Sequence, residues 1–293
     1  MKLLIIGGTG QLGSALVKDA TSLNYEAISP SKEEFNIDDE STFRYILSCD
    51  KPDVVINTAA FNDTVLCERQ PENAFKYNSI AVKNIALACN DFDTQFITFS
   101  TDYVFDGLKN KPYIESDLTY PLQIYGTSKS IGEHLSLLYN KNTIVIRTST
   151  LYGLNKSKSG KVNFIDRIIN NSKSNRSIEV ANNKIVNSTN AEDLSKAVLK
   201  LIIHPGKEHG IYHLVNEGHC SMFDLAKETF NILDINIEII PVNHEEISNG
   251  IRRPLFSALK NRKAKKLGIK LPYWKISLKN YLEIKYKNKV QFK

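Results

Sequence analysis

A short apolar run followed directly by closely spaced glycines constrains the fold of this chain more than any other feature. The run Leu3–Ile6 is typical of a strand buried on both faces of a parallel sheet. Gly8, Gly10 and Gly13 then have the spacing Gly-x-Gly-x-x-Gly, and Gly7 widens it to Gly-x-x-Gly-x-x-Gly. Such glycines permit a tight strand-to-helix turn, and the following helix N-terminus presents N–H groups to a pyrophosphate. The turn therefore predicts dinucleotide binding, with a purely structural turn as the alternative.

Strand-like and helix-like segments alternate through the first half of the chain. This alternation predicts an α/β fold with a doubly wound, Rossmann-like parallel sheet. Ligands bind beyond the carboxyl ends of the strands in such sheets, where we expect Gly10, Ala59, Thr101 and Ser149. The expected strands cover 3–6, 52–57, 95–100 and 143–148, with another ending near 26–30, and the expected helices cover 73–89 and 128–139.

The pattern changes after Gly153. The polar segment 155–161 predicts a mobile loop over the site. We expect a dinucleotide-binding domain at 1–153 and a smaller, mainly substrate-binding domain at 154–293, with parts near 189–216 returning to the main sheet. The expected helices of this half cover 163–172, 189–203 and 222–233, and the expected strands cover 210–215 and 237–240.

Tyr125 and Lys129 form a Tyr-x-x-x-Lys pair that follows the run Ser100–Phe105. Residues four apart share a helix face, so the lysine ammonium can lie beside the phenol. A tyrosine with a pKa of about 10 is a poor acid near neutrality, and a neighbouring cation lowers that pKa. With the Thr101 hydroxyl to hold a carbonyl oxygen, the trio predicts reversible hydride chemistry in which Tyr125 gives or takes the proton. A solvated helix face is the alternative for the Tyr–Lys pair.

The cofactor preference depends on the residues after the second expected strand. An acidic residue about 20 positions after the glycines usually binds the ribose 2′-hydroxyl of NAD. Ser31 and Lys32 occupy that place, and Glu33 and Glu34 come slightly late. Lys32 can pair with a 2′-phosphate, so NADPH is the expected cofactor and NADH the alternative. A solvated loop lysine is the other interpretation of Lys32.

Composition excludes several classes of protein. With 293 residues, of which 42% are hydrophobic and 24% charged, the chain is typical of a globular protein, and no apolar run reaches membrane-spanning length. The first strand begins too early to leave room for a signal peptide, so we expect a cytoplasmic protein with no membrane partner. Cys49, Cys67, Cys89 and Cys220 lack Cys-x-x-Cys spacing, which is typical of reduced thiols.

The net charge of +6 is unevenly placed, because the stretch from Lys260 to the C-terminus has Glu283 as its only acid. This stretch lacks the aromatic residues of a base-stacking platform, so we expect a solvated basic face that attracts an anionic nucleotide and no nucleic-acid partner. His209 and His213 lie in an expected strand, where four residues span about 13 Å, too far for one metal ion. No metal site is therefore expected.

Together these motifs resemble those of the extended short-chain dehydrogenase/reductases, and more narrowly those of the dTDP-4-dehydrorhamnose reductases. The resemblance covers nearly the whole chain, with the motifs in the family's order. The broader match comprises Gly7–Gly13, Asn57–Ala60, Ser100–Gly107, Tyr125–Lys129 and Arg147–Ser149. The narrower match comprises Gly10–Gly13, Ser100–Phe105, Asn163–Phe164, Tyr212–Val215 and Arg252–Pro254 with Ser257.

The resemblance implies NADP-dependent reduction of the C4 ketone of a nucleotide-linked 4-keto-6-deoxysugar, for surface polysaccharide synthesis. Thr101, Tyr125 and Lys129 would be the catalytic residues, and Lys129 would also hold the nicotinamide ribose. A homodimer is compatible with the family. The implied cofactor-binding residues are Gly7, Gly10, Gln11, Leu12, Gly13, Ser31, Lys32, Asp38, Ala59, Ala60, Tyr125 and Lys129. The implied substrate-binding residues are Asp102, Tyr103, Val104, Asn163 and Arg253.

Three segments depart from the family pattern. An Asp-Lys-Ala-Glu stretch is replaced by Val65–Glu68, a tryptophan by Thr150, and a Gln-Phe-Gly-x-Pro-Thr stretch by Asn183–Thr189. Because these lie around the expected sugar pocket or a subunit contact, a reductase or epimerase of another nucleotide sugar stays open. A non-catalytic, nucleotide-binding regulatory subunit, like that of methionine adenosyltransferase, is a further alternative. Surface charge is the alternative for Arg252 and Arg253. The nucleotide, the C4 stereochemistry, the oligomeric state and a metal at a subunit interface are left open.

Overall fold

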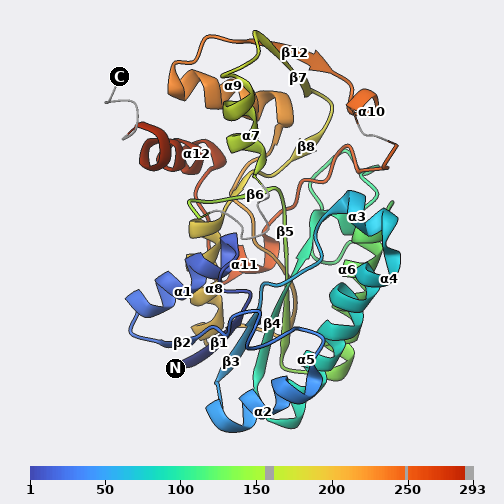
Figure 1. Cartoon of the computed structure of the whole chain (residues 1–293), viewed down its shortest axis with the longest axis vertical. Helices are drawn as coiled ribbons and strands as arrows, with labels where there is room; N and C mark the ends of the chain where they lie inside the picture. Colours follow the sequence, from blue (N-terminus) through green and yellow to red (C-terminus); the bar gives the residue numbers. More distant parts are fainter. Residues whose placement is uncertain (156–161, 248–249, 288–293) are drawn as a thin grey trace.

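The computed structural model describes residues 1–155, 162–247 and 250–287, and Figure 1 shows how its elements are arranged. The loop expected over the site at 155–161 lies outside these ranges, apart from Asn155. No helix in the described parts of the chain is long and apolar enough to cross a bilayer.

A six-stranded sheet forms the centre of the molecule, and every pairing in it is parallel. The strand order is β10-β5-β4-β3-β1-β2. Strand β2 is added on one side of β1 and strands β3, β4 and β5 on the other, so the order of addition switches between β1 and β3. This order confirms the predicted doubly wound, Rossmann-like fold. The strands are β1 (Lys2–Ile6), β2 (Glu26–Ile28), β3 (Val54–Asn57), β4 (Gln95–Thr101), β5 (Thr143–Thr148) and β10 (Gly210–His213).

Helices cover both faces of this sheet. Alternate side chains of β1 point to opposite faces. Leu3 and Ile5 therefore join the hydrophobic cluster of α1 and α8, and Leu4 and Ile6 join that of α2 and α5. This two-sided burial explains the uninterrupted apolar run in the sequence. The helices are α1 (Gln11–Ser22), α8 (Ala191–Ile203), α2 (Glu40–Asp50), α5 (Ala81–Asp91) and α6 (Ile124–Tyr139).

The helix expected at 73–89 is interrupted. It consists of α4 (Pro71–Phe75), a π-helical turn over Lys76–Ile80, and α5. Asn78 in that turn bonds the backbone N–H and C=O of Phe61, each at 2.9 Å, and donates to Ser128 Oγ at 3.1 Å. The π turn therefore ties the loop after β3 to α6, and sequence periodicity does not reveal such a one-residue irregularity.

A second group of elements packs beyond the carboxyl ends of the strands, at the top of Figure 1. Its core contains Ile165, Ile178, Leu225, Trp274 and Leu278. Three two-stranded sheets pair β7 with β12, β8 with β11 and β6 with β9. The longer elements are α7 (Phe164–Asn171), β7 (Ser177–Ala181), α9 (Met222–Leu233), β12 (Glu238–Val242) and α12 (Trp274–Leu282). The shorter ones of this group are β6 (Leu151–Tyr152), β8 (Ile185–Val186), β9 (Thr189–Asn190), β11 (Cys220–Ser221) and α10 (His244–Ile247). Two further short helices pack with the main sheet and its helices: α3 (Thr64–Arg69) contacts α6, and α11 (Arg262–Lys266) contacts β10.

Helix α8 begins later than the sequence predicted. Thr189 and Asn190 form β9, and the Asn190 side chain accepts from Asp193 N at 2.9 Å as the N-cap of the helix.

The division of the chain at residue 153 stays a prediction, and β10 pairs with β5 of the main sheet.

His213 lies in β10 and is fully buried, with Nδ1 3.2 Å from the Tyr113 carbonyl oxygen. All four cysteines are free thiols. Within the described ranges, no group of three or more His, Cys, Asp or Glu side chains is placed to hold a metal ion.

Leu16→Ala tests the packing of α1 on the sheet. Leu16 is fully buried, so the substitution leaves a cavity and we expect a loss of about 2–5 kcal/mol in the free energy of unfolding. Urea unfolding followed by circular dichroism measures it. Leu138→Ala is the matched control, because Leu138 on α6 is 75% exposed and its loss should change stability by under about 0.5 kcal/mol. Equal effects of the two substitutions would contradict this account of the core.

Candidate functional site

The glycine turn after β1 admits no side chains at two positions. Gly7 has a φ of +79°, and a Cβ there would lie 2.8 Å from Thr58 Oγ1. A Cβ on Gly13 would lie 2.2 Å from the Gly7 carbonyl oxygen, a backbone atom that cannot move aside. The helix, the turn and the loop after β3 are therefore in backbone contact, as the sequence predicted for a phosphate-binding turn.

The N-terminus of α1 is suited to an anion. Gly10 is the N-cap and makes no side-chain capping bond, and the first turn contains no acidic residue. Gln11 bonds the Gly153 carbonyl at 3.5 Å and Leu12 is buried, so the backbone of this turn is the part open to a ligand. Across the turn lie Ala59, half-buried, and Ala60, exposed.

The residues expected around the cofactor's adenosine end follow β2. Ser31 and Glu34 bond one another reciprocally, and Lys32 is exposed with no ion pair among the described residues. Asp38 pairs with Lys76 at 2.5 Å, and this partner holds the pKa of the Asp38 carboxyl below its usual value. Its second oxygen, Oδ1, is buried without a hydrogen-bond partner in the described structure. That oxygen is thus a buried acceptor whose hydrogen-bonding capacity is unused in the described structure.

The three residues expected to be catalytic lie at the end of β4 and in the first two turns of α6. Thr101 is the last residue of β4, and its Oγ1 accepts from Tyr103 N at 3.2 Å. Helix α6 begins at Ile124, four residues earlier than predicted, so Tyr125 lies in its first turn and Lys129 one turn later. Tyr125 is half-buried and Lys129 is only 6% exposed. The Tyr–Lys pair is therefore not a solvated helix face.

The pKa of Tyr125 shifts in the direction opposite to our expectation. Burial raises the pKa of Tyr125 well above its usual value, and a hydrogen bond with Thr101 acts against that rise. Burial also lowers the pKa of Lys129 to about 8, while the Glu133 carboxylate acts to raise it. The sequence argument considered the neighbouring cation and omitted desolvation, which is the larger effect here.

A buried ion pair supports Lys129, and sequence analysis missed it. Glu133 lies one turn after Lys129 on the same face of α6. Arg147 of β5 donates to it through Nε at 2.9 Å and Nη2 at 2.7 Å, and both side chains are at most 2% exposed. The guanidinium also lies 5.1 Å from the centre of the Phe105 ring. The four-residue spacing from Tyr125 through Lys129 to Glu133 is the signal that could have indicated this pair.

Two of the expected substrate-binding residues lie beside this trio. Asp102 is buried, accepts hydrogen bonds from Ser257 Oγ and Thr101 Oγ1, and burial raises the pKa of its carboxyl. The Tyr103 ring meets the Tyr125 ring edge-on, with centroids 6.2 Å apart, and its hydroxyl accepts from Lys184 Nζ at 2.6 Å.

Two others have different surroundings. The Val104 side chain is fully buried in a separate core cluster, and its expected contact with substrate stays a prediction. Asn163 is the N-cap of α7: its Oδ1 accepts from Asp166 N at 3.0 Å and its Nδ2 donates to Asp166 and Tyr281. Both the oxygen and the nitrogen of the Asn163 amide therefore have partners. A sequence does not reveal the burial of Val104 or the bond from Asn163 to Tyr281, because each depends on residues far away in the chain.

Helix α3 connects the fifth expected substrate residue to α6. Arg253 donates through Nη2 to Thr64 Oγ1 at 3.2 Å at the start of α3. At the other end of the helix, Glu68 Oε1 accepts from the N–H of Ile124 at 2.7 Å. Glu68 is the retained glutamate of the altered Val65–Glu68 segment, and it holds the first turn of the helix that carries Tyr125.

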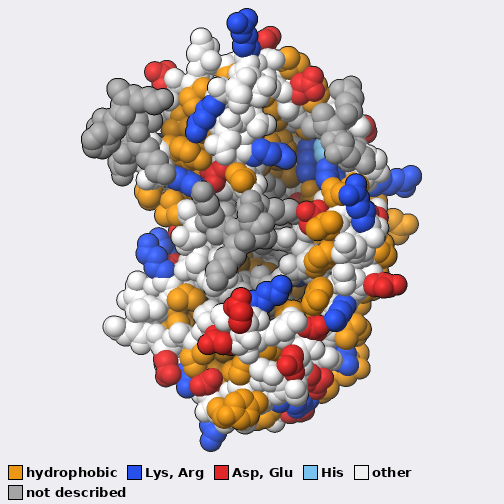
Figure 2. All heavy atoms as spheres, in the orientation of Figure 1, with side chains coloured by type: hydrophobic (Ala, Val, Ile, Leu, Met, Phe, Trp, Pro, Cys, Tyr) orange, Lys and Arg blue, Asp and Glu red, His pale blue; other side chains and the backbone are white. Residues whose placement is uncertain are grey.

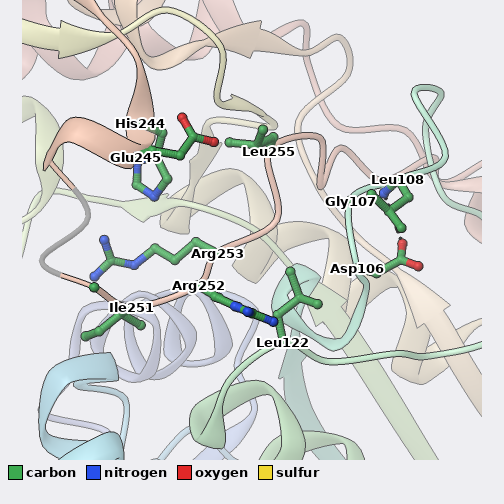
Figure 3. Close-up of a pocket in the computed structure, with 11 residues that line it drawn as sticks. Asp106, Gly107, Leu108, Leu122, His244, Glu245, Ile251, Arg252, Arg253 and Leu255 are labelled. Carbon is green, nitrogen blue, oxygen red and sulfur yellow. Dashed lines mark hydrogen bonds between the residues drawn. The ribbon is translucent and has the colours of Figure 1, made fainter.

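A cavity of about 320 Å³ opens between the loop after Tyr103 and the segment around Arg253 (Figure 3). Arg253 and His244 point toward one another at one end of it, and Asp106 lies at the other. Burial lowers the pKa of His244 to about 4, with the charges of Lys184 and Arg253 acting in the same direction. Figure 2 shows basic side chains and a histidine gathered in this hollow. The cavity is lined by Asp106, Gly107, Leu108, Leu122, His244, Glu245, Gly250, Ile251, Arg252, Arg253 and Leu255.

Comparison with known proteins matches residues 1–287 to the family model described as RmlD substrate binding domain. The spore coat polysaccharide biosynthesis protein SpsK of Bacillus subtilis (strain 168) is 35% identical over 96% of this chain and 97% of its own length. A crystal structure of a dTDP-4-dehydrorhamnose reductase from Clostridium acetobutylicum has a TM-score of 0.90 at 32% identity, covering 97% of this chain and 99% of that one. The dTDP-4-dehydrorhamnose reductase of Bacillus anthracis in complex with NADP also has a TM-score of 0.90, at 28% identity, covering 96% and 98%.

Arg147→Met tests the buried ion pair. It leaves the Glu133 carboxylate buried without its partner, so we expect a loss of about 3–5 kcal/mol in the free energy of unfolding. The double variant Glu133→Leu/Arg147→Met leaves neither charge of the pair and should recover much of that loss. Urea unfolding midpoints decide the matter, and a double variant less stable than Arg147→Met would sink the explanation.

Proposed function

We propose a function from the family to which this chain belongs, the RmlD substrate binding domain family of extended short-chain dehydrogenase/reductases. The chain reduces the C4 ketone of a nucleotide-linked 4-keto-6-deoxysugar with NADPH. The product would serve polysaccharide synthesis, as in the relative from Bacillus subtilis. The observation that supports the proposal is the hydrogen bond between Thr101 at the carboxyl end of β4 and Tyr125, with Lys129 buried one helical turn after Tyr125.

The glycine turn and its surroundings fit a dinucleotide. The backbone contact at Gly7 and Gly13 leaves room for a diphosphate at the α1 N-terminus, where Gln11 and Leu12 contribute backbone N–H groups. The unpartnered Asp38 Oδ1 accepts a hydrogen bond at the adenine end. Ala59 and Ala60 border the bound cofactor, with Ser31 beside Lys32 at the ribose.

Lys32 supports NADPH over NADH. It is exposed beyond β2 without an ion pair among the described residues, so a 2′-phosphate can take that place.

The residues of the trio divide the proton chemistry between them. When bound, the reduced nicotinamide supplies a hydride to the sugar C4. The phenol of Tyr125 gives its proton to the carbonyl oxygen, on which negative charge develops, and the Thr101 hydroxyl holds that oxygen. Lys129 stabilises the phenolate left behind, which counters the cost that burial imposes on Tyr125.

The cationic end of the cavity supports a diphosphate-linked sugar. Arg252 and Arg253 both line the cavity. The planar fork of an arginine guanidinium suits the oxygens of a diphosphate. Asp102 and Tyr103 then border the sugar between these cations and Tyr125.

Oxidation of NADPH, and separately of NADH, on addition of an enzymatically generated dTDP-4-keto-6-deoxysugar tests the activity. We expect turnover with NADPH, and Tyr125→Phe should lower kcat about 10²–10⁴-fold because the proton donor is lost, with NADPH affinity unchanged. Tyr139→Phe, on the far end of α6, is the control. Normal NADPH binding without turnover on any ketosugar would contradict the proposal and favour a non-catalytic regulatory subunit.

The pH profile of kcat/KM tests the role of Lys129. Its pKa of about 8 means that the ammonium is lost as pH rises through that value, so activity should decline there. Glu133→Gln removes the charge that raises this pKa, so the decline should move to lower pH. Glu238→Gln, an exposed carboxylate on β12, should leave the profile unchanged. An unchanged decline in Glu133→Gln would show that another group controls it.

A further inference from the structure

Lys184 is a cation beside Tyr103 that none of the roles above uses. It lies immediately before β8, within the Asn183–Thr189 segment, where the family pattern Gln-Phe-Gly-x-Pro-Thr has no lysine at its fixed positions. Its ammonium donates to the Tyr103 hydroxyl at 2.6 Å and lies 5.1 Å from the centre of that ring. Tyr103 in turn meets Tyr125 edge-on. Lys184 therefore reaches the immediate surroundings of the proposed proton donor.

Lys184 is half-buried, and no carboxylate of the described residues forms an ion pair with it. Its field acts on Asp102, where it opposes the effect of burial, and on His244. The oxygens of Asp102 already accept from Ser257 and Thr101. A half-buried ammonium with only a phenol as its hydrogen-bond partner is suited to an anionic ligand.

The backbone places Lys184 beside the arginine segment. Ile185 N donates to the Leu255 carbonyl at 2.6 Å, and Ser257 N donates to the Ile185 carbonyl at 3.0 Å. This pairing brings Lys184 alongside the segment that follows Arg253, where Ile185 and Phe256 form an isolated β-bridge. The two cations nevertheless differ in direction, because Arg253 bonds Thr64 of α3 whereas Lys184 bonds Tyr103. Lys184 is thus the cation nearer to the reacting end of the sugar.

We propose that Lys184 binds the sugar-linked β-phosphate of the nucleotide diphosphate, and so sets the position of C4 relative to Tyr125. This inference rests on the proposed function, which supplies a nucleotide-linked sugar. Arg253 then carries the charge on the nucleoside side, and the diphosphate lies between cations on two adjacent segments. The lysine in the altered segment gives this chain a phosphate contact that the family pattern does not specify.

Binding of dTDP and dTMP by isothermal titration calorimetry tests the inference, because only dTDP has a β-phosphate. Lys184→Met should weaken dTDP binding by about tenfold or more, as expected for a lost charge-assisted hydrogen bond, and leave dTMP affinity unchanged. Lys184→Arg should retain most of the affinity for dTDP. Lys200→Met, an exposed lysine on α8, is the matched control for loss of one positive charge.

Tyr103→Phe distinguishes direct binding from an effect through the tyrosine. If Lys184 contacts the phosphate, Lys184→Met should weaken dTDP binding by a similar factor in the Tyr103→Phe background. The inference is overturned if Lys184→Met no longer weakens dTDP binding in the Tyr103→Phe background. It is also overturned if Lys184→Met weakens dTDP and dTMP binding equally, or if the wild-type protein binds the two nucleotides equally. If the enzyme reduces the ketosugar but Lys184→Met leaves dTDP binding unchanged, the inference about Lys184 is refuted and the proposed function stands. If Lys184 gives a preference for dTDP but no ketosugar is reduced, the proposed function is refuted and the inference about Lys184 stands.

Discussion

The burial of a lysine ammonium in α6 is the constraint on which the proposed site depends. Desolvation of Lys129 is unfavourable and lowers its pKa, and the protein offsets this with the Glu133 carboxylate one turn away. Glu133 is itself buried and needs the two-pronged bond from Arg147 on β5. Each charge is tolerated because of the next, and the Glu133–Arg147 contact ties α6 to β5. The same helix carries Tyr125, which bonds Thr101.

The same helix depends on backbone contacts that leave little freedom. A Cβ on Gly132 would lie 2.1 Å from the Asn78 carbonyl oxygen, so α6 and the π-helical turn touch along their backbones. Glu68 holds the first N–H of α6 from the other side. Three neighbours therefore hold α6 in the proposed site. Arg147 on β5 pairs with it electrostatically, the π-helical turn contacts its backbone, and Glu68 on α3 accepts a hydrogen bond from its first N–H.

Sequence reasoning reached the fold because its signals are local. The apolar run, the glycine spacing and the Tyr-x-x-x-Lys pair each occupy a few consecutive residues, and the strand at Thr143–Thr148 was predicted at its observed bounds. The surroundings that sequence reasoning did not anticipate depend on contacts between distant residues. Val104 lies in a core that Tyr113 and Leu259 complete, and the Asn163 amide bonds Tyr281. The direction of the Tyr125 pKa shift depends on how many atoms surround the phenol, which no motif records.

The path of the chain has a consequence for folding during synthesis. Helix α8 covers the face of the sheet that Leu3 and Ile5 enter, and β10 completes the sheet's edge beside β5. Both elements are made only after the first part of the second group, including α7 and β7. The nascent sheet therefore exposes an apolar face and an unpaired strand edge while those segments are synthesised. Contacts between such distant segments favour slow folding, and they make this stage of synthesis the one at which the chain most needs protection from aggregation.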